Sequence, residues 1–340
     1  MLGRYLFRRV CAAVITLFGV SVLIFLIARI IPGDPARIAL GDTATLEQIA
    51  QFRKTLRLDD PLPVQYVTYM QGVLKGDLGT SIYTGGDVLS DLRRTFPATL
   101  ELVCVSALLM ISIGIPLGTL AGRFRDSFLD NFTRLFSLIG VVTPGFVWAV
   151  FLLLVFAYWL EILPVTGRLS EGVPVPPHVT GLYLIDSALA RDWTTFKDAF
   201  LHIIMPGISL SLASIGQTTR MTRANVGESY DRTYIEFARA YGFNELRIAG
   251  TYALRPAMIP TLTILGLDLA IKFGGAFLIE TVYAWPGMAR YGVRVILHKD
   301  LNAIVGVVVI IGFFFVVINL VVDMIVAFVD PRIRLGSRAR

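Results

Sequence analysis

Two side chains of opposite charge, Asp268 and Lys272, stand four residues apart within a run of apolar residues. On a helix this spacing places both on one face, with the acid N-terminal to the base. Charges inside a membrane are costly and usually face a cavity or a partner. One hypothesis is that the pair, with Glu280 farther along, lines a translocation path for a zwitterionic solute. The alternative is a self-neutralising pair at a subunit interface.

A second group of residues lies in a polar loop between two apolar runs, within positions 220–256. Asp231 is expected to cap a helix that ends before Gly242, which would adopt a positive φ. The expected helix has an apolar face at helical spacing, formed by Tyr234, Phe237, Ala238 and Tyr241.

A second helix is predicted directly after this one. Asn244 is expected to cap it, and Pro256 marks a kink or boundary before the next apolar run. One face of this helix is expected to carry Leu246, Ala249 and Ala253. A helical plug of this kind could dock into a partner, or it could be an ordinary loop packed on its own helices; the residues alone leave both readings open.

No residue pattern predicts catalysis or a bound cofactor. The chain has no Gly-x-x-x-x-Gly-Lys-Ser/Thr phosphate loop, and the pair Gly274-Gly275 is not followed by lysine. The apolar runs contain no His-Glu-x-x-His and no paired serine and histidine. Its three histidines and two cysteines lack metal-ligand spacing. We therefore expect no metal and no ATP hydrolysis by this chain itself.

Composition predicts an all-α integral membrane protein. Hydrophobic residues make up 55% of the 340 residues and charged residues only 16%, whereas soluble domains carry about 25% charged residues. Six apolar runs have the length that a membrane-spanning helix needs. They are Val10–Ile31, Leu100–Ala121, Leu135–Leu160, Ile203–Thr219, Met258–Ile279 and Ala303–Phe328.

Arginines gather on one side of the six predicted spans, around both termini and the 220–256 loop. The positive-inside rule places this side, with both termini, in the cytoplasm. The net charge of +6 follows from this bias and does not indicate nucleic-acid binding. The first run ends at Arg29 rather than at a small-residue cleavage site, so we expect a retained helix.

Two longer segments are expected on the outer side. The first, 32–97, is predicted to hold two short helices, one with a capping box at Thr45 and Gln48 and one marked by Tyr66 and Tyr69. The second, Glu161–Phe200, is expected to be a loop with few regular elements. Glu101 is expected at the outer interface, and Trp285 is expected to anchor there.

With these elements placed, the loop resembles the "EAA" motif of ABC importer membrane subunits. Further segments are similar to landmarks of the dipeptide/oligopeptide/nickel permease family, in its first-subunit (DppB/OppB-type) branch. The resemblance runs in order along nearly the whole chain, through Ile31-Pro-Gly-Asp-Pro-Ala36, Gly76-Asp-Leu-Gly79, Leu163-Pro-Val-Thr-Gly-Arg168, Glu280-Thr-Val-Tyr-Ala-Trp-Pro-Gly287 and Asp330-Pro-Arg-Ile-Arg334.

The resemblance implies the membrane domain of a type I ABC importer in a bacterial cytoplasmic (inner) membrane. Its partners would be a second permease subunit, two ATP-binding subunits that use ATP and Mg²⁺, and an extracytoplasmic solute-binding protein. It implies an outer-gate role for Trp285, Pro286 and Gly287. The residues that it assigns to ATPase coupling are Tyr234, Glu236, Phe237, Ala238, Arg239, Ala240, Gly242, Ile259 and Pro260.

The expected organisation is an N-terminal transmembrane helix (1–31), an extracytoplasmic helical segment (32–97), a transmembrane core (98–329) and a cytoplasmic tail (330–340). The expected function is import of di- or oligopeptides, coupled through the 231–256 loop. Alternatives are the same architecture importing nickel, glutathione or an oligosaccharide, or a stand-alone secondary transporter. The latter predicts internal repeats and broken helices in corresponding halves, which the sequence does not clearly show.

Overall fold

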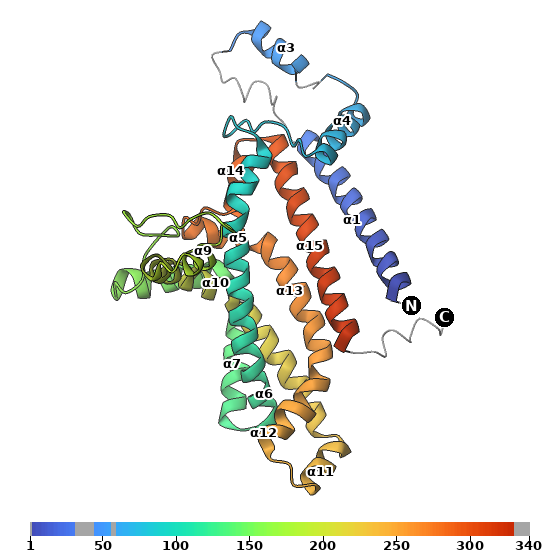
Figure 1. Cartoon of the computed structure of the whole chain (residues 1–340), viewed down its shortest axis with the longest axis vertical. Helices are drawn as coiled ribbons and strands as arrows, with labels where there is room; N and C mark the ends of the chain where they lie inside the picture. The colour runs from blue at the N-terminus through green and yellow to red at the C-terminus, as the bar shows by residue number, and fades with distance from the viewer. Residues whose placement is uncertain (1, 31–43, 56–58, 330–340) are drawn as a thin grey trace. The chain divides into compact units, whose positions relative to one another are not determined.

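The computed structural model describes residues 2–30, 44–55 and 59–329 (Figure 1). These residues form helices and connecting turns, with one isolated bridge between Thr80 and Asp87 and no strand among them. The tail at 330–340 and the first family landmark after the first helix lie outside the described residues. The chain divides into two compact units, each of which is described by itself.

The first unit is built from Leu100–Trp285 with the chain from Val317 onward. Its helices are the second half of α5 (Val88–Leu109), η1 (Met110–Gly114), α6 (Ile115–Arg123), α7 (Phe128–Val142), α8 (Gly145–Leu152), η2 (Leu153–Trp159), α9 (Tyr183–Leu189), α10 (Trp193–Tyr230), α11 (Thr233–Ala240), α12 (Glu245–Arg247), η3 (Ile248–Ala253) and α13 (Leu254–Val282).

The second unit joins Pro286–Val316 to the described parts of Gly3–Thr99. Its core packs the start of α5 against α14 (Met288–Leu297) and the first turns of α15 (Leu301–Val329), around Val88, Leu92 and Met288. Buried carboxylates hold the segments of this unit together through hydrogen bonds. Asp300 accepts a 2.5 Å hydrogen bond from Ser81, and Asp91 accepts one of 3.1 Å from Tyr291. Its helices are α1 (Leu2–Ile30), α3 (Leu46–Thr55), α4 (Leu62–Lys75), α14 (Met288–Leu297) and most of α15 (Leu301–Val329).

The two short helices predicted in the outer segment are present as α3 and α4. At the start of α3 the backbone N–H of Thr45 donates to Gln48 Oε1 at 2.9 Å, and the N–H of Gln48 donates to Thr45 Oγ1 at 3.3 Å. This reciprocal pair is the predicted capping box.

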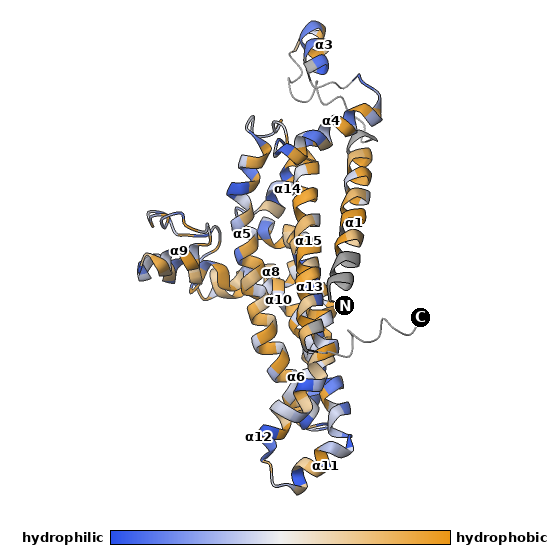
Figure 2. Ribbon diagram, turned by 45° about the vertical axis from the view of Figure 1, so that its right-hand side comes forward, coloured by the Kyte–Doolittle hydropathy of each residue, from blue (hydrophilic) through white to orange (hydrophobic). Residues whose placement is uncertain are grey.

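Among the described residues, five helices are long and apolar enough to cross a membrane, and a bent pair makes a sixth span if it is counted as one. Figure 2 shows the hydrophobic residues that run along α13 and α15. The helices over the predicted span Leu135–Leu160 are sharply bent, because α7 and the helix from Gly145 meet at 103°. Thr143 is extended (φ −82°, ψ 123°) before Pro144, as the proline ring requires of the residue before it.

The segment Glu161–Phe200 is more helical than predicted. It contains α9 and the first two turns of α10, which begins ten residues before the predicted fourth span. Asp192 caps α10 by accepting a 3.0 Å hydrogen bond from the N–H of Thr195. Hydropathy missed this start because the first turns of α10 are polar.

The helices α6 and α10 approach so closely that only glycine fits between them. A Cβ on Gly118 would lie 2.6 Å from Thr222 Cβ and 2.7 Å from the carbonyl oxygen of Thr219. Gly114 and Gly122, one turn to either side, make equally close approaches to α10. Small residues spaced four apart allow such backbone contact between membrane helices.

Candidate functional site

The helix α11 stands with α12 at one end of the first unit, beyond the ends of α6 and α13 (Figure 1). One face of α11 is buried against its own unit. Ile235 is fully buried and Ala238 nearly so, in a cluster completed by Val226 of α10 and by residues of η3 and α13. The cluster fixes the position of α11 against η3, which leads into α13, and against α10.

The opposite face of α11 is apolar and uncovered. Tyr234, Phe237 and Tyr241 have 40%, 63% and 81% of their surface exposed, and their spacing places them along one side of the helix. Glu236, Ala240 and Arg239 are also exposed. The predicted apolar face is thus divided, since only its Ala238 packs inward and the three aromatic side chains point away from the protein.

The C-terminus of α11 confirms the predicted positive φ of Gly242. Its φ is +80°, a value that only glycine adopts at little cost. The N–H of Gly242 donates to the carbonyl of Arg239 at 2.9 Å, and that of Phe243 donates to the carbonyl of Ala238 at 3.2 Å. This pair of bonds is a Schellman motif, which ends the helix and turns the chain toward α12.

The predicted start of α11 is wrong by one residue. Asp231 closes α10, and its carboxylate lies 3.4 Å from the guanidinium of Arg125. Arg232 is the residue before α11 and makes no side-chain cap. Asp231 and Arg232 link α10 to α11, so Asp231 closes α10 and does not cap α11.

The second helix of the loop begins as predicted but presents a different face. Asn244 caps it by accepting a 2.8 Å hydrogen bond from the N–H of Arg247. Ala249 and Ala253 are buried, whereas Leu246 is 76% exposed. The predicted common face fails because Ile248–Ala253 is a π-helix, whose wider turn changes the angular spacing of side chains.

An ionic contact ties the loop to its neighbours. Arg239 donates to Glu245 at 2.8 Å, and Glu245 also lies 3.9 Å from Arg123 at the end of α6. Ile259 and Pro260, predicted as part of the coupling motif, lie in α13 and belong neither to the buried cluster nor to the exposed face of α11.

The intramembrane pair exists as predicted on one face of α13. Lys272 Nζ lies 3.3 Å from Asp268 Oδ2 and donates to the carbonyl of Leu210 at 2.9 Å and to Ser214 Oγ at 2.5 Å. Ser214 in turn hydrogen-bonds Asp268 Oδ1 at 2.9 Å. The lysine is buried, whereas 28% of the aspartate side chain is exposed.

Glu280 is fully buried. Trp285, with 1% of its surface exposed, packs inside the first unit with the guanidinium of Arg168 5.7 Å from its ring. The expectation of an interfacial aromatic anchor is therefore wrong for Trp285, because its ring cannot reach headgroups. Pro286 is exposed, and Gly287 is the residue before α14.

Sequence reasoning missed a buried ion pair between Glu101 and Arg168. The guanidinium donates to Glu101 Oε2 at 2.5 Å and to the carbonyl of Gly181 at 3.1 Å, while the N–H of Leu184 donates to Glu101 Oε1 at 2.7 Å. The expectation that Glu101 is an outer-interface residue is wrong, since 5% of its side chain is exposed. Arg168 is the last residue of the family landmark Leu163-Pro-Val-Thr-Gly-Arg168, and this position was the only sequence signal that pointed to the ion pair.

A second missed pair joins α7 to α10. Asp130 is fully buried and accepts hydrogen bonds from both Nε and Nη2 of Arg223. The two residues are 93 positions apart, so no local pattern reveals the contact. No group of three or more metal-ligating side chains comes together among the residues that the structure describes.

Comparison with known proteins covers almost the whole chain. Residues 114–335 match the family model of the "Binding-protein-dependent transport system inner membrane component", and residues 1–103 match "Binding-prot-dependent transport system membrane comp, N-term". One relative, the "Probable D,D-dipeptide transport system permease protein DdpB" of Escherichia coli K12, is 42% identical over 97% of each chain.

Two further relatives carry similar names. The "Dipeptide transport system permease protein DppB" of Escherichia coli K12 is 34% identical over 97% of this chain and 98% of its own. The "Di/tripeptide transport system permease protein DppB" of Pseudomonas aeruginosa UCBPP-PA14 has the same identity and coverage.

Proposed function

The chain belongs to the family of binding-protein-dependent transport system inner membrane components, and from this premise we propose that it is the permease subunit of an ATP-driven importer of di- and oligopeptides. It forms half of the translocation path beside a second permease subunit. An extracytoplasmic binding protein delivers the solute, and two ATP-binding subunits that hold ATP and Mg²⁺ supply the energy. The chain itself binds no nucleotide.

The observation that carries this proposal is the two-sided character of α11. Ile235 and Ala238 hold one face on the chain's own helices, while the aromatic face of Tyr234, Phe237 and Tyr241 is uncovered. Exposed aromatic side chains on a rigidly held element are typical of a docking surface. Closure of the ATPase pair would push on α11, and α10 and α13 would carry the movement into the bundle as a rigid body.

The proposed substrate class rests on the relatives. Those that cover the chain end to end are named for transport of D,D-dipeptides, dipeptides and di- or tripeptides. A peptide carries an ammonium and a carboxylate, which complement in charge the partly exposed side chain of Asp268 and the buried ammonium of Lys272. Nickel, glutathione and oligosaccharides are the competing solutes to test.

The proposed site of action is a bacterial cytoplasmic membrane. The five or six apolar helices and the family support this. We place α11 and both chain termini in the cytoplasm because the arginines of the 220–256 loop and of both termini obey the positive-inside rule only in that orientation.

Copurification tests the docking role. The double variant Phe237→Glu, Tyr241→Glu places two carboxylates on the exposed face without touching the buried cluster. We expect it to retain the second permease subunit and to lose the ATPase subunits in pull-downs from native membranes. The matched control is Leu46→Glu, which adds an acid at an 80% exposed apolar residue of α3; ATPases retained by the double variant would refute docking through α11.

Transport assays test the substrate and the energy source. In a strain that lacks the chromosomal copy, we expect the chain to restore uptake of L,L- and D,D-dialanine but not of nickel, glutathione or an oligosaccharide. Uptake should stop when the partner ATPases carry a substituted phosphate-loop lysine. Uptake that persists with inactive ATPases would instead indicate a stand-alone secondary transporter.

A further inference from the structure

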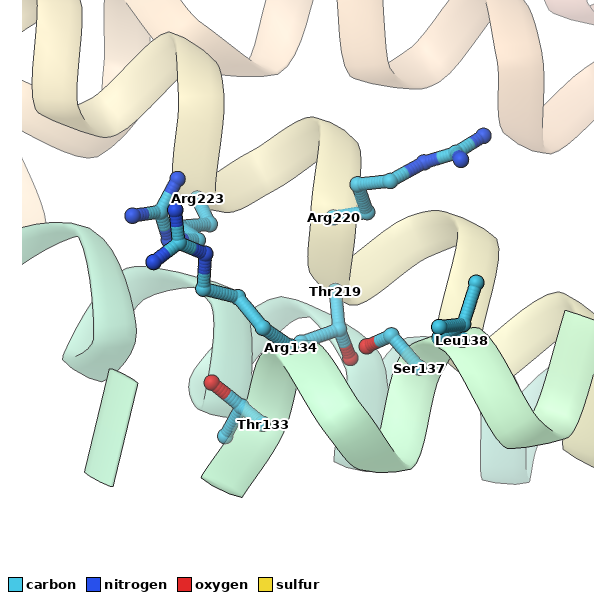
Figure 3. A pocket seen from close by; sticks show the side chains of 7 residues that line it. All are labelled: Thr133, Arg134, Ser137, Leu138, Thr219, Arg220 and Arg223. Carbon is cyan, nitrogen blue, oxygen red and sulfur yellow. The ribbon is translucent and has the colours of Figure 1, made fainter. Parts of the chain in front are cut away.

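A cavity of about 350 Å³ lies between α7 and α10 (Figure 3). It is separate from α11 and from the Asp268–Lys272 pair, and the function proposed above leaves it unused. Three arginines surround it, together with hydroxyl groups from both helices. Its lining residues are Thr133, Arg134, Ser137, Leu138, Thr219, Arg220 and Arg223.

The two helices that form the cavity are locked together beside it. A Cβ on Gly216 would lie 2.7 Å from the carbonyl oxygen of Ser137, and one on Gly140 would lie 3.0 Å from that of Leu212. The backbones therefore touch one turn away from the cavity. The walls are consequently fixed by backbone contact, and the cavity is a built feature of the fold.

The charge around the cavity is positive. Asp130 neutralises Arg223 through its two hydrogen bonds. Arg134 and Arg220 hydrogen-bond instead to the neutral side-chain amides of Asn131, at 3.3 Å, and Gln217, at 2.5 Å. Figure 3 shows the side chains of Arg134 and Arg223 converging and that of Arg220 extending in another direction.

Two hydroxyl groups inside the cavity have no hydrogen-bond partner among the described residues. Ser137 Oγ and Thr219 Oγ1 are both buried, with side chains of residues that are 3% and 1% exposed. A buried hydroxyl without a partner costs about 1–3 kcal/mol. Both hydroxyls can donate to the oxygens of a bound anion, which would remove this cost.

The surface beside the cavity is apolar. Leu138 lines the cavity and is 58% exposed, and Leu135 and Phe132 of the same helix are exposed to a similar extent. Arginine recognises phosphate because its planar fork of N–H donors matches the phosphate oxygens. A phosphate whose bearer also has hydrocarbon chains would satisfy both the arginines and the neighbouring apolar surface of α7.

We propose that the cavity between α7 and α10 binds a phosphate group, presented by an anionic phospholipid whose acyl chains lie along the exposed face of α7. Arg134 and Arg220 bind the charge, and Ser137 and Thr219 donate to the phosphate oxygens. Basic pockets between helices on the cytoplasmic side of membrane proteins bind headgroups in this way. The leaflet follows from the orientation proposed above, whereas binding itself does not depend on it.

The test is native mass spectrometry of the assembled complex in detergent, titrated with dioleoyl phosphatidylglycerol. Dioleoyl phosphatidylcholine and inorganic phosphate are titrated in parallel. We expect phosphatidylglycerol to bind in preference to phosphatidylcholine, and the double variant Arg134→Gln, Arg220→Gln to weaken its binding roughly tenfold or more. Arg223 is left in place because its removal would leave the charge of the buried Asp130 uncompensated.

Two controls keep the result specific. Arg232→Gln removes an exposed arginine that pairs with Glu228 outside the cavity, and we expect it to leave lipid binding unchanged. The pair Ser137→Ala, Thr219→Val removes the hydroxyl groups without altering charge and should weaken binding by a few fold, with unchanged thermal stability of the complex.

Equal binding of both lipids, or full phosphatidylglycerol binding by the arginine double variant, would overturn the proposal. Tight binding of inorganic phosphate that depends on the same two arginines would retain the phosphate site but refute its lipid source.

Discussion

Two of the buried ion pairs in the first unit differ in construction. Glu101 and Arg168 come from separate elements, and both are less than 8% exposed. Each oxygen of Glu101 accepts a hydrogen bond, and the guanidinium stacks 3.4 Å above the centre of the Tyr183 ring. Asp268 and Lys272 share one helix, and Asp268 Oδ2 accepts no hydrogen bond although its lysine is 3.3 Å away.

The difference indicates different uses. A buried pair whose carboxylate is fully satisfied and sealed from solvent acts as a structural tie, because removing either partner strands a charge. A pair whose acid remains partly exposed and incompletely hydrogen-bonded can still receive another group. We therefore assign the Glu101–Arg168 pair to stability and keep the Asp268–Lys272 pair as the candidate for contact with the solute or with the second permease subunit.

The largest loss of stability is expected at the Glu101–Arg168 pair. Arg168→Met should destabilise the protein by about 3–5 kcal/mol, since it leaves Glu101 buried and uncompensated. Unfolding in mixed micelles with increasing dodecyl sulfate measures this loss. Adding Glu101→Leu to the same chain should restore most of the stability. If Arg168→Met alone is as stable as the parent, the Glu101–Arg168 pair is not a structural tie.

The Asp268–Lys272 pair should tolerate replacement of its cation by methionine better. Lys272→Met should cost about 1–3 kcal/mol, less than Arg168→Met, because water can reach Asp268. The double variant Asp268→Leu, Lys272→Met removes both charges and should assemble normally. If the pair lines the path, dipeptide uptake by this assembled double variant falls at least about tenfold; unchanged uptake would place the pair at an interface instead.

Acidification tests the loop that supports Arg168. Burial acts to raise the pKa of Asp186, but hydrogen bonds from Thr180, Gly181 and Val179 outweigh it and hold the pKa below its usual value. The unfolded chain therefore binds this proton more readily, so the contribution of Asp186 to stability is complete above about pH 4 and is lost as the pH falls through the folded pKa.

Hydrogen exchange of residues 176–190, corrected for the intrinsic rate, measures this dependence. Protection should stay constant from pH 7 to 5 and fall below about pH 4. In Asp186→Asn the protection should be lower already at pH 7 and should vary less with pH; a parent loop whose protection is lost between pH 7 and 5 would contradict the assignment.

The smallest loss of stability is expected at Ser214, which hydrogen-bonds both Asp268 and Lys272. Ser214→Ala should cost about 0.5–1.5 kcal/mol, the net value of a typical hydrogen bond, because Lys272 keeps its bond to the carbonyl of Leu210. The same dodecyl sulfate titration measures it. A loss of stability as large as that of Arg168→Met would mean that the Asp268–Lys272 pair is also a structural tie.

Local features of the fold were predictable because they depend on neighbouring residues. The positive φ of Gly242, the cap at Asn244, the capping box at Thr45 and the shared face of Asp268 and Lys272 each require only a few consecutive positions. The bend at Pro144 was also available from the sequence, since proline restricts the residue before it. The prediction of a span over Leu135–Leu160 included no bend because hydropathy averages over this restriction.

The candidate site was predictable only in part. The motif located α11 and its Gly242, but the face of α11 that packs inward is decided by Val226, Ile248 and Ala257, which come from three other elements. The face that remains exposed is therefore a tertiary property. The same holds for the polar first turns of α10, whose helical state follows from the cap at Asp192 and not from hydropathy.

The sequence by itself determined that this chain crosses a membrane, approximately where it does so, and to which family it belongs, because hydrophobic length and motif order are properties of a linear string. Tertiary structure alone decided that Glu101 meets Arg168, that Asp130 meets Arg223, and that Arg134 and Arg220 surround one cavity. These contacts join residues tens of positions apart. The contacts between α7 and α10 form where Gly140 and Gly216 bring the two backbones together, and no local spacing encodes that geometry.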